Sequence, residues 1–175
     1  RLIASLSLDG LQKTHDEIRC PKSFERTIRT FQSLKKIKGL RVKFNTVLCE
    51  KNAGEIVELL HFVKSLEPAF HSILPLRGSP LDPSMRLPSP EKISALEKDI
   101  YLVQRSYNYG RTGILSRIQR NYQAYKRELA AAILREKRQV IPCLAGRAHL
   151  VVWPNGAVAP CELLPPVGNI KETGL

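Results

Sequence analysis

The chain has 175 residues, of which 43% are hydrophobic and 25% are charged. This balance is typical of a folded globular protein and excludes a disordered chain. No apolar run approaches the roughly 18 residues that a membrane span needs, and the start, RLIASLSLDG, lacks the pattern of a signal peptide. Both ends of the sequence read as positions inside a longer chain.

The chain is basic, with 28 Lys and Arg against 16 Asp and Glu, a net charge of +12. Such a charge can attract nucleic acid, but the basic residues are scattered and no RNA-binding motif with interleaved aromatics occurs. A solvated basic surface is favoured over a nucleic-acid interface. The four cysteines are too few for the disulfide framework of a small secreted protein, so we expect a protein of the reducing cytoplasm with free or metal-bound thiols.

The first 76 residues alternate between strand and helix patterns. Strands are predicted over Leu2–Leu8, Arg41–Leu48 and Ala69–Leu76. Two amphipathic helices lie between them, and their apolar positions are Phe24, Ile28, Phe31, Leu34 and Ile37, then Ile56, Leu59, Leu60, Val63 and Leu66. Asn52 is predicted to cap the second helix, with Glu55 completing a capping box.

Crossovers of this length make neighbouring strands parallel, which predicts an α/β fold. The pattern fits either a doubly wound sheet or a barrel of the (βα)₈ type, and in both the ligands bind at the C-terminal ends of the strands. A proline-rich loop, 78–90, follows the third strand and is read as a linker or an active-site flap.

The rest of the chain is predicted to hold two helices and a β-hairpin. The helices are separated by Asn108-Tyr109-Gly110, and their apolar positions are Ile93, Leu96, Ile100, Val103 and Tyr107, then Ile114, Ile118, Tyr122, Tyr125, Leu129 and Ile133. The hairpin pairs Ala148–Trp153 with Ala157–Glu162 around Pro154-Asn155-Gly156. We place the domain boundary near Val140.

Two cysteines, Cys143 and Cys161, flank this hairpin with the spacing C-x₁₂-G-x₄-C. A hairpin brings its ends together, so the two thiolates can converge on one soft metal centre. Two thiolates do not complete a four-thiolate shell, and the other ligands must come from elsewhere. Two buried structural cysteines, or a zinc hairpin, are the alternative interpretations.

Polar residues gather at the predicted ligand-binding ends of the first two strands. The segment SLSLDGLQKTHDEIR presents Ser7 and Asp9, and Arg19 can form a bidentate pair with a carboxylate. His15 beside Asp16 is read as local hydrogen bonding rather than acid–base chemistry. Asn45 lies within the second strand and needs a partner, either from the protein or from a ligand. Cys49, at that strand's end, is read as inert.

Three segments, taken in order, resemble the radical S-adenosylmethionine (SAM) superfamily, in the branch with SPASM or twitch auxiliary domains. SLDGLQKTHDEIR resembles that family's fourth barrel strand and the turn after it, and VKFNTVLCEKNAGEI resembles its fifth strand and helix start. CLAGRAHLVVWPNGAVAPCELLPPVGNIKE resembles the opening of the auxiliary iron–sulfur domain. The resemblance covers nearly the whole chain.

The resemblance implies the second half of a partial (βα)₆ barrel over 1–90, a helical connection over 91–139, and the start of an auxiliary domain over 140–175. It implies a [4Fe–4S] cluster and SAM, which together generate a 5′-deoxyadenosyl radical that abstracts a substrate hydrogen. Ser7 and Arg19 match positions that bind the methionine end of SAM, with Arg26 as the alternative arginine. Asp9 belongs to the same motif. The strands containing Asn45 and Leu74 match those lining the ribose and adenine.

Cys143 and Cys161 match ligands of an auxiliary [4Fe–4S] or related cluster. The family's CxxxCxxC loop is absent from the 175 residues, so the ligands of the catalytic cluster lie outside this chain and the chain alone is expected to be inactive. The implied partners are SAM, a reducing electron donor and a substrate, which in this family is often a peptide. A non-catalytic binding module and a basic nucleic-acid-binding protein are the rival interpretations.

Overall fold

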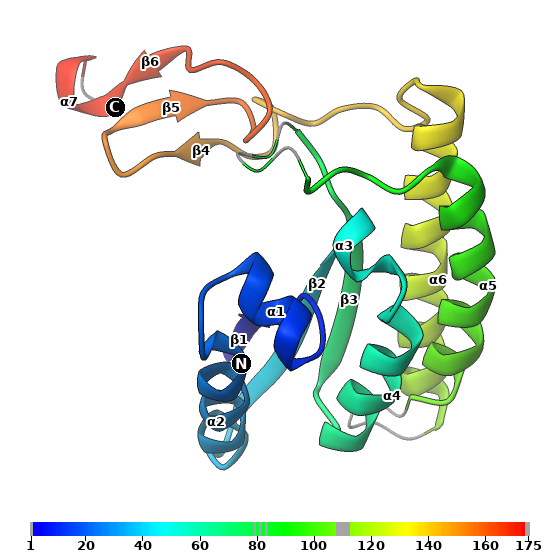
Figure 1. The fold of residues 1–175 in the computed structure, drawn as a ribbon. Helices are drawn as coiled ribbons and strands as arrows, with labels where there is room; N and C mark the ends of the chain where they lie inside the picture. The colour runs from blue at the N-terminus through cyan, green and yellow to red at the C-terminus, as the bar shows by residue number, and fades with distance from the viewer. Residues whose placement is uncertain (1, 79, 81, 83, 108–112, 174–175) are drawn as a thin grey trace. The chain divides into compact units, whose positions relative to one another are not determined.

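The computed structural model describes residues 2–78, 80, 82, 84–107 and 113–173, which fall into two compact units, Arg1–Glu136 and Lys137–Leu175. Among these residues, every helix is too short or too polar to cross a membrane. The predicted break at 108–110 lies outside the described residues. The elements of the first unit are β1 Leu2–Ser7, α1 Gln12–Ile18, α2 Ser23–Lys35, β2 Leu40–Leu48, α3 Glu50–Ala53, α4 Ile56–Leu66, β3 Phe70–Pro75, α5 Pro90–Arg105 and α6 Gly113–Glu136 (Figure 1).

The three strands of the first unit form a parallel sheet in the order β1-β2-β3. The predicted α/β class, the parallel pairing and the three strands, within two residues at each end, are confirmed. The barrel remains a prediction. The register of the two strand pairs places Leu6, Phe44 and His71 side by side.

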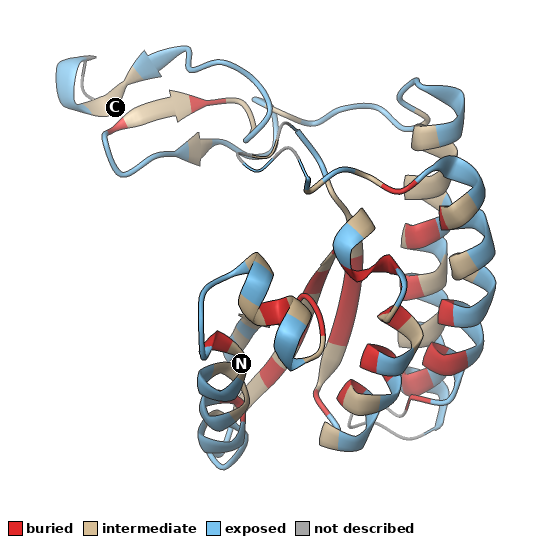
Figure 2. Cartoon of the chain, in the orientation of Figure 1, coloured by how far each residue is buried: buried red, intermediate tan, exposed pale blue. Residues whose placement is uncertain are grey.

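The core lies on the face of the sheet that carries Leu6, Phe44 and His71. Side chains alternate between the two faces of a strand, so Leu8, Val42, Leu48 and Ile73 point to the same side. Phe31 of α2 packs on Phe44, with ring centroids 4.7 Å apart. Figure 2 shows the buried positions of the helices turned towards the sheet. Each large apolar side chain buried here stabilises the fold by about 1.5–3 kcal/mol.

The predicted apolar face of α4 is confirmed, but the predicted cap at its start is wrong. Cys49 caps a separate short helix, α3, and Asn52 is the third residue of that helix. The Asn52 side chain accepts a hydrogen bond from the Cys49 backbone N–H at 2.9 Å. It also donates to the carbonyls of Asp9 and Val47, at 2.7 and 2.8 Å. Asn52 therefore ties α3 to the ends of β1 and β2.

The first four positions of the predicted apolar stripe of α6, Ile114, Ile118, Tyr122 and Tyr125, are solvent-exposed. The last two, Leu129 and Ile133, are half-buried. The buried positions of α6 are instead polar, namely Ser116, Gln123 and Arg127. The periodicity predicted the helix correctly, but it did not show whether the apolar side faces the core or the solvent.

The second unit is a small antiparallel sheet of β4 Val151–Val152, β5 Ala157–Ala159 and β6 Gly168–Asn169, followed by α7 Ile170–Thr173. Val151 pairs with Ala159, which confirms the hairpin, although its strands are shorter than predicted. Gly156 closes the turn with φ +91°, and a Cβ there would lie 2.5 Å from Asn169 Oδ1. Glycine is therefore required at this turn. The third strand, β6, was not predicted.

Candidate functional site

The face of the sheet opposite the core carries a row of polar side chains. Ser7 pairs with Asn45 across β1 and β2, and Asn45 pairs with Ser72 across β2 and β3. Ser5 and Ser7 are exposed, and Asn45 is half-buried. Parallel sheets are normally apolar on both faces because helices cover both. A polar face is therefore suited to contact a ligand rather than a helix.

Asn45 has an unfilled hydrogen-bonding position on this polar face. Its Nδ2 donates to Ser5 Oγ at 2.8 Å, whereas its Oδ1 is buried and has no hydrogen-bond donor among the described residues. A buried acceptor without a partner costs about 1–3 kcal/mol. A ligand that offers a hydroxyl or an amine to Asn45 Oδ1 would remove that cost.

Leu74 lies on the same face, two residues beyond Ser72 on β3, where it pairs with Val47 of β2. Both side chains are half-buried and apolar. The structure thus brings Ser7, Asn45 and Leu74 onto one face. Ser5 and Ser72 were missed as site residues, although the two-residue period of a strand places Ser5 on the side of Ser7.

Asp9 holds Arg19 at the C-terminal end of the sheet. Arg19 donates to Asp9 Oδ2 from Nε, and its Nη2 is also 2.6 Å from that oxygen. Asp9 Oδ1 accepts from the Val47 backbone N–H at 2.8 Å, and the Asp9 side chain is only 2% exposed. Asp9 is thus an internal anchor. The Arg19 side chain is 42% exposed and remains able to reach a ligand.

The alternative arginine, Arg26, has a different partner. Its Nη2 donates to the exposed Cys20 Sγ at 3.0 Å. Among the described residues, Arg19 is thus the arginine of the two that pairs with Asp9.

His15 and Asp16 serve the local structure. His15 is buried, its Nδ1 accepts from the Asp9 backbone N–H at 3.0 Å, and burial lowers the pKa of the imidazole. Asp16 accepts from the backbone N–H groups of Phe24 and Lys22 at the start of α2. The bond from Phe24 is the main reason that the pKa of Asp16 is lowered. This agrees with the expected local hydrogen bonding.

The turn after β1 leaves no room for a side chain at Gly10. A Cβ there would lie 2.6 Å from Glu55 Oε1 and 2.8 Å from Thr14 Cβ. Glu55 Oε1 in turn accepts from the Leu11 backbone N–H at 2.7 Å. Glu55, expected in a capping box, therefore holds the turn that carries Asp9.

Gly10→Ala is expected to lower the free energy of unfolding by about 1–3 kcal/mol, because Glu55 and the α1 backbone must shift. Urea unfolding of the chain measures this change. Gly54→Ala is the matched control, since nothing lies within 4 Å of a Cβ at Gly54. Equal stability of the Gly10 variant and the wild type would show that the turn is looser than described.

The hairpin cysteines share one local geometry. Cys143 Sγ accepts from the Ala145 backbone N–H, and Cys161 Sγ accepts from the Leu163 backbone N–H, both at 3.4 Å. Neither cysteine is in a disulfide; Cys143 is exposed and Cys161 is half-buried. Backbone N–H groups directed at sulfur stabilise a thiolate and tune a bound cluster. This geometry fits metal ligands better than buried structural cysteines.

Among the described residues, no three His, Cys, Asp or Glu side chains lie close enough together to hold a metal ion. The described residues therefore contain no complete metal site. Cys49 is fully buried at the cap of α3, which agrees with its expected inert role.

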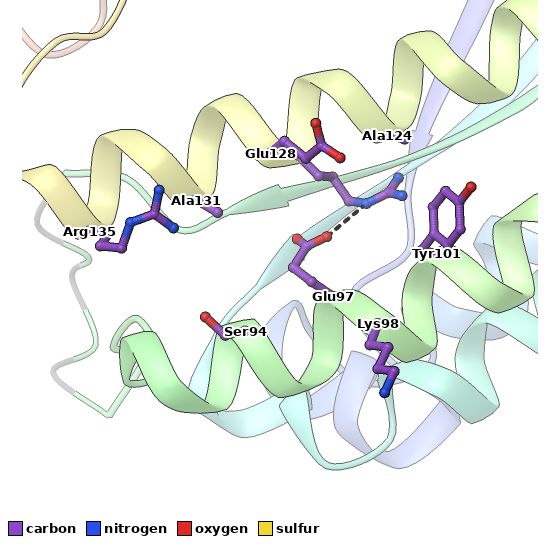
Figure 3. Close-up of a pocket in the computed structure, with 9 residues that line it drawn as sticks. Ser94, Glu97, Lys98, Tyr101, Ala124, Glu128, Ala131 and Arg135 are labelled. Carbon is purple, nitrogen blue, oxygen red and sulfur yellow. Dashed lines mark hydrogen bonds and ion pairs between the residues drawn. The ribbon is translucent and has the colours of Figure 1, made fainter.

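A pocket of about 440 Å³ lies between α5 and α6, and one ion pair, Glu97 with Arg127, joins its two walls (Figure 3). Arg127 Nε donates to Glu97 Oε2 at 3.1 Å, and the Arg127 guanidinium also bonds Gln104 Oε1. Gln104 Nε2 donates to the His71 carbonyl at 3.3 Å. Desolvation raises the pKa of Glu97. This network joins both helices to β3, and we assign it a structural role.

A comparison with protein-family models found no match to this chain, and a comparison with curated proteins found no similar sequence.

Proposed function

We propose that this chain is part of a radical SAM enzyme, in which the polar face of β1, β2 and β3 lines the SAM site inside a (βα)₆ barrel. The observation that carries the proposal is the polar face itself. A parallel sheet with Ser7, Asn45 and Ser72 side by side, and with Asn45 Oδ1 buried and unpartnered among the described residues, is suited to face a polar ligand.

The described residues fit SAM by their chemistry. Arg19, fixed by Asp9, offers a cation to the carboxylate of the amino-acid end, and the Ser7 hydroxyl offers a hydrogen bond nearby. Asn45 Oδ1 offers an acceptor to a ribose hydroxyl or to the adenine amine. Leu74 offers an apolar contact to the base. When bound, SAM and a reduced [4Fe–4S] cluster would supply the chemistry that removes a hydrogen atom from a substrate.

The ligands of that catalytic cluster would come from a CxxxCxxC loop outside these 175 residues. Cys143 and Cys161 would provide two thiolates to an auxiliary cluster, and the backbone N–H groups of Ala145 and Leu163 support thiolate character in both. Further ligands, the electron donor and a substrate, such as a peptide, would be supplied from outside the described residues.

The test is SAM binding by a protein that carries this chain behind its CxxxCxxC loop, measured by equilibrium dialysis under anaerobic conditions. Ser7→Ala and Arg19→Gln are each expected to weaken SAM binding about tenfold, the usual scale for losing a hydrogen bond to a charged group. Ser65→Ala, on the exposed side of α4, is the matched serine control and is expected to bind SAM as the wild type does.

Unchanged SAM affinity in both site variants would refute the assignment of the polar face. A folded protein that binds no SAM would favour the non-catalytic binding module. Binding of DNA or RNA that weakens steeply with salt would favour the nucleic-acid-binding alternative.

A further inference from the structure

The outer side of α6 is an unusual surface for a helix of this length. Ile114, Ile118, Tyr122 and Tyr125 recur every three or four residues and are 55–73% exposed. We refer to these four side chains as the outer stripe. Folded monomers rarely expose a continuous apolar surface, and such surfaces mark interaction sites. The outer stripe is therefore a candidate interface.

One flank of the outer stripe carries an exposed basic and an exposed acidic side chain, Arg117 and Glu128. They lie about three helical turns apart, so both project from the same side of α6. Within the described part of the chain, neither forms an ion pair. Glu128 borders the pocket between α5 and α6, where Glu97 rather than Glu128 is the acidic partner of Arg127. Both charges are thus available to a partner.

We propose that α6 binds α6 of a second copy of this chain, antiparallel, through the outer stripe. Two helices related by a two-fold axis in this way bring the same flank of each helix together. Arg117 of each copy then faces Glu128 of the other, which gives two ion pairs for one interface. The charge pattern complements itself, whereas an acidic or lipid partner would match a flank with basic residues only.

The apolar side chains fit the same register. When Arg117 faces Glu128 of the second copy, Tyr125 lies opposite the gap between Ile118 and Tyr122 of that copy. This is the knobs-into-holes arrangement of paired helices. On the other flank, Lys126 lies over the Tyr122 ring at 5.6 Å and faces the neutral Gln119 of the second copy. The register thus keeps like charges on the two copies apart.

The experiment is sedimentation velocity of the 175-residue chain over a concentration series, with charge reversals at the two flanking positions. Arg117→Glu and Glu128→Arg should each raise the dimer dissociation constant about tenfold or more, because both ion pairs become repulsive contacts. Mixing the two single variants in equal amounts should restore dimers. In a mixed dimer one ion pair forms with its charges exchanged, and the other is the native pair of Arg117 and Glu128. Arg105→Glu, on α5, is the matched control and should leave dimerisation unchanged.

Recovery of dimers on mixing shows that neither substitution acts by unfolding the protein. Far-ultraviolet circular dichroism checks the fold of each variant directly. A wild type that stays monomeric overturns the proposal. So does a dimer that is insensitive to Arg117→Glu, because another surface then forms it. Failure of the mixed variants to associate better than either variant alone overturns the antiparallel register.

Discussion

His71→Gln is expected to make the chain markedly less sensitive to acid. His71 is fully buried on the core face of β3, its ring stacks on Tyr107, and burial lowers its pKa to about 3. The Thr46 hydroxyl donates to the Leu8 carbonyl at 2.6 Å, so its oxygen accepts from His71 Nε2 at 2.8 Å. The other ring nitrogen, Nδ1, is buried without a partner among the described residues.

The direction of the effect follows from the two pKa values of His71. In the unfolded chain the imidazole takes up a proton near pH 6.5, whereas in the folded chain it stays neutral down to about pH 3. The unfolded state therefore binds more protons between these values, and stability falls as the pH falls from 6.5 towards 3. The slope is about 1.4 kcal/mol per pH unit for one such group.

Urea unfolding of wild type and His71→Gln at about pH 7.5, 5.5 and 4.5 measures this contribution. Gln keeps a donor for Thr46 but does not titrate, so the stability difference should shift in favour of the variant by about 1.4 kcal/mol per unit below about pH 6.5. His15 adds a loss of the same sign, and Glu97 acts in the opposite sense, but both are common to the two proteins. Parallel pH profiles would show that His71 is protonated in the folded chain.

Changing Cys143 and Cys161 together to Ala is expected to remove about one iron–sulfur cluster per protein, because loss of two thiolates leaves an incomplete shell. The protein must be prepared anaerobically with its CxxxCxxC loop present, and iron and acid-labile sulfide are counted. Cys20→Ala is the matched control, since Cys20 is an exposed cysteine outside the hairpin. It is expected to leave the iron content unchanged.

Two results would contradict the cluster at the hairpin. Iron content that does not change in the double variant would mean that the cysteines hold no cluster. Zinc that co-purifies with the wild type and is lost from the double variant would establish the zinc hairpin instead.

The strands of the first unit were predictable because their pattern is local. Arg41–Leu48 alternates between the two faces of a sheet, and its side chains reach opposite faces in the structure, with Phe44 in the core and Asn45 on the polar face. The same two-residue period places Ser7 beside Asn45 once the strands pair in parallel. The register of the strands, which the sequence does not give, then decides which polar residues share a face.

Helix orientation and caps depend on contacts distant in sequence. The α6 pattern has one apolar side, but Arg127 is buried because Glu97 and Gln104 of α5 pair with it. Asn52 resembles a helix cap, yet it lies inside α3 because it bonds the backbone of Asp9 and Val47. Asp9 looked like a ligand contact, and only the fold shows it anchoring Arg19. None of these pairings has a local signal.

The most direct test of the proposed function is formation of 5′-deoxyadenosine from SAM by the reduced protein with its CxxxCxxC loop. We expect this product to accumulate with the wild type, and to form more slowly with Ser7→Ala and Arg19→Gln but at the wild-type rate with Ser65→Ala. A protein that contains its clusters and binds SAM, but yields no 5′-deoxyadenosine on reduction, would contradict the assignment to the radical SAM enzymes.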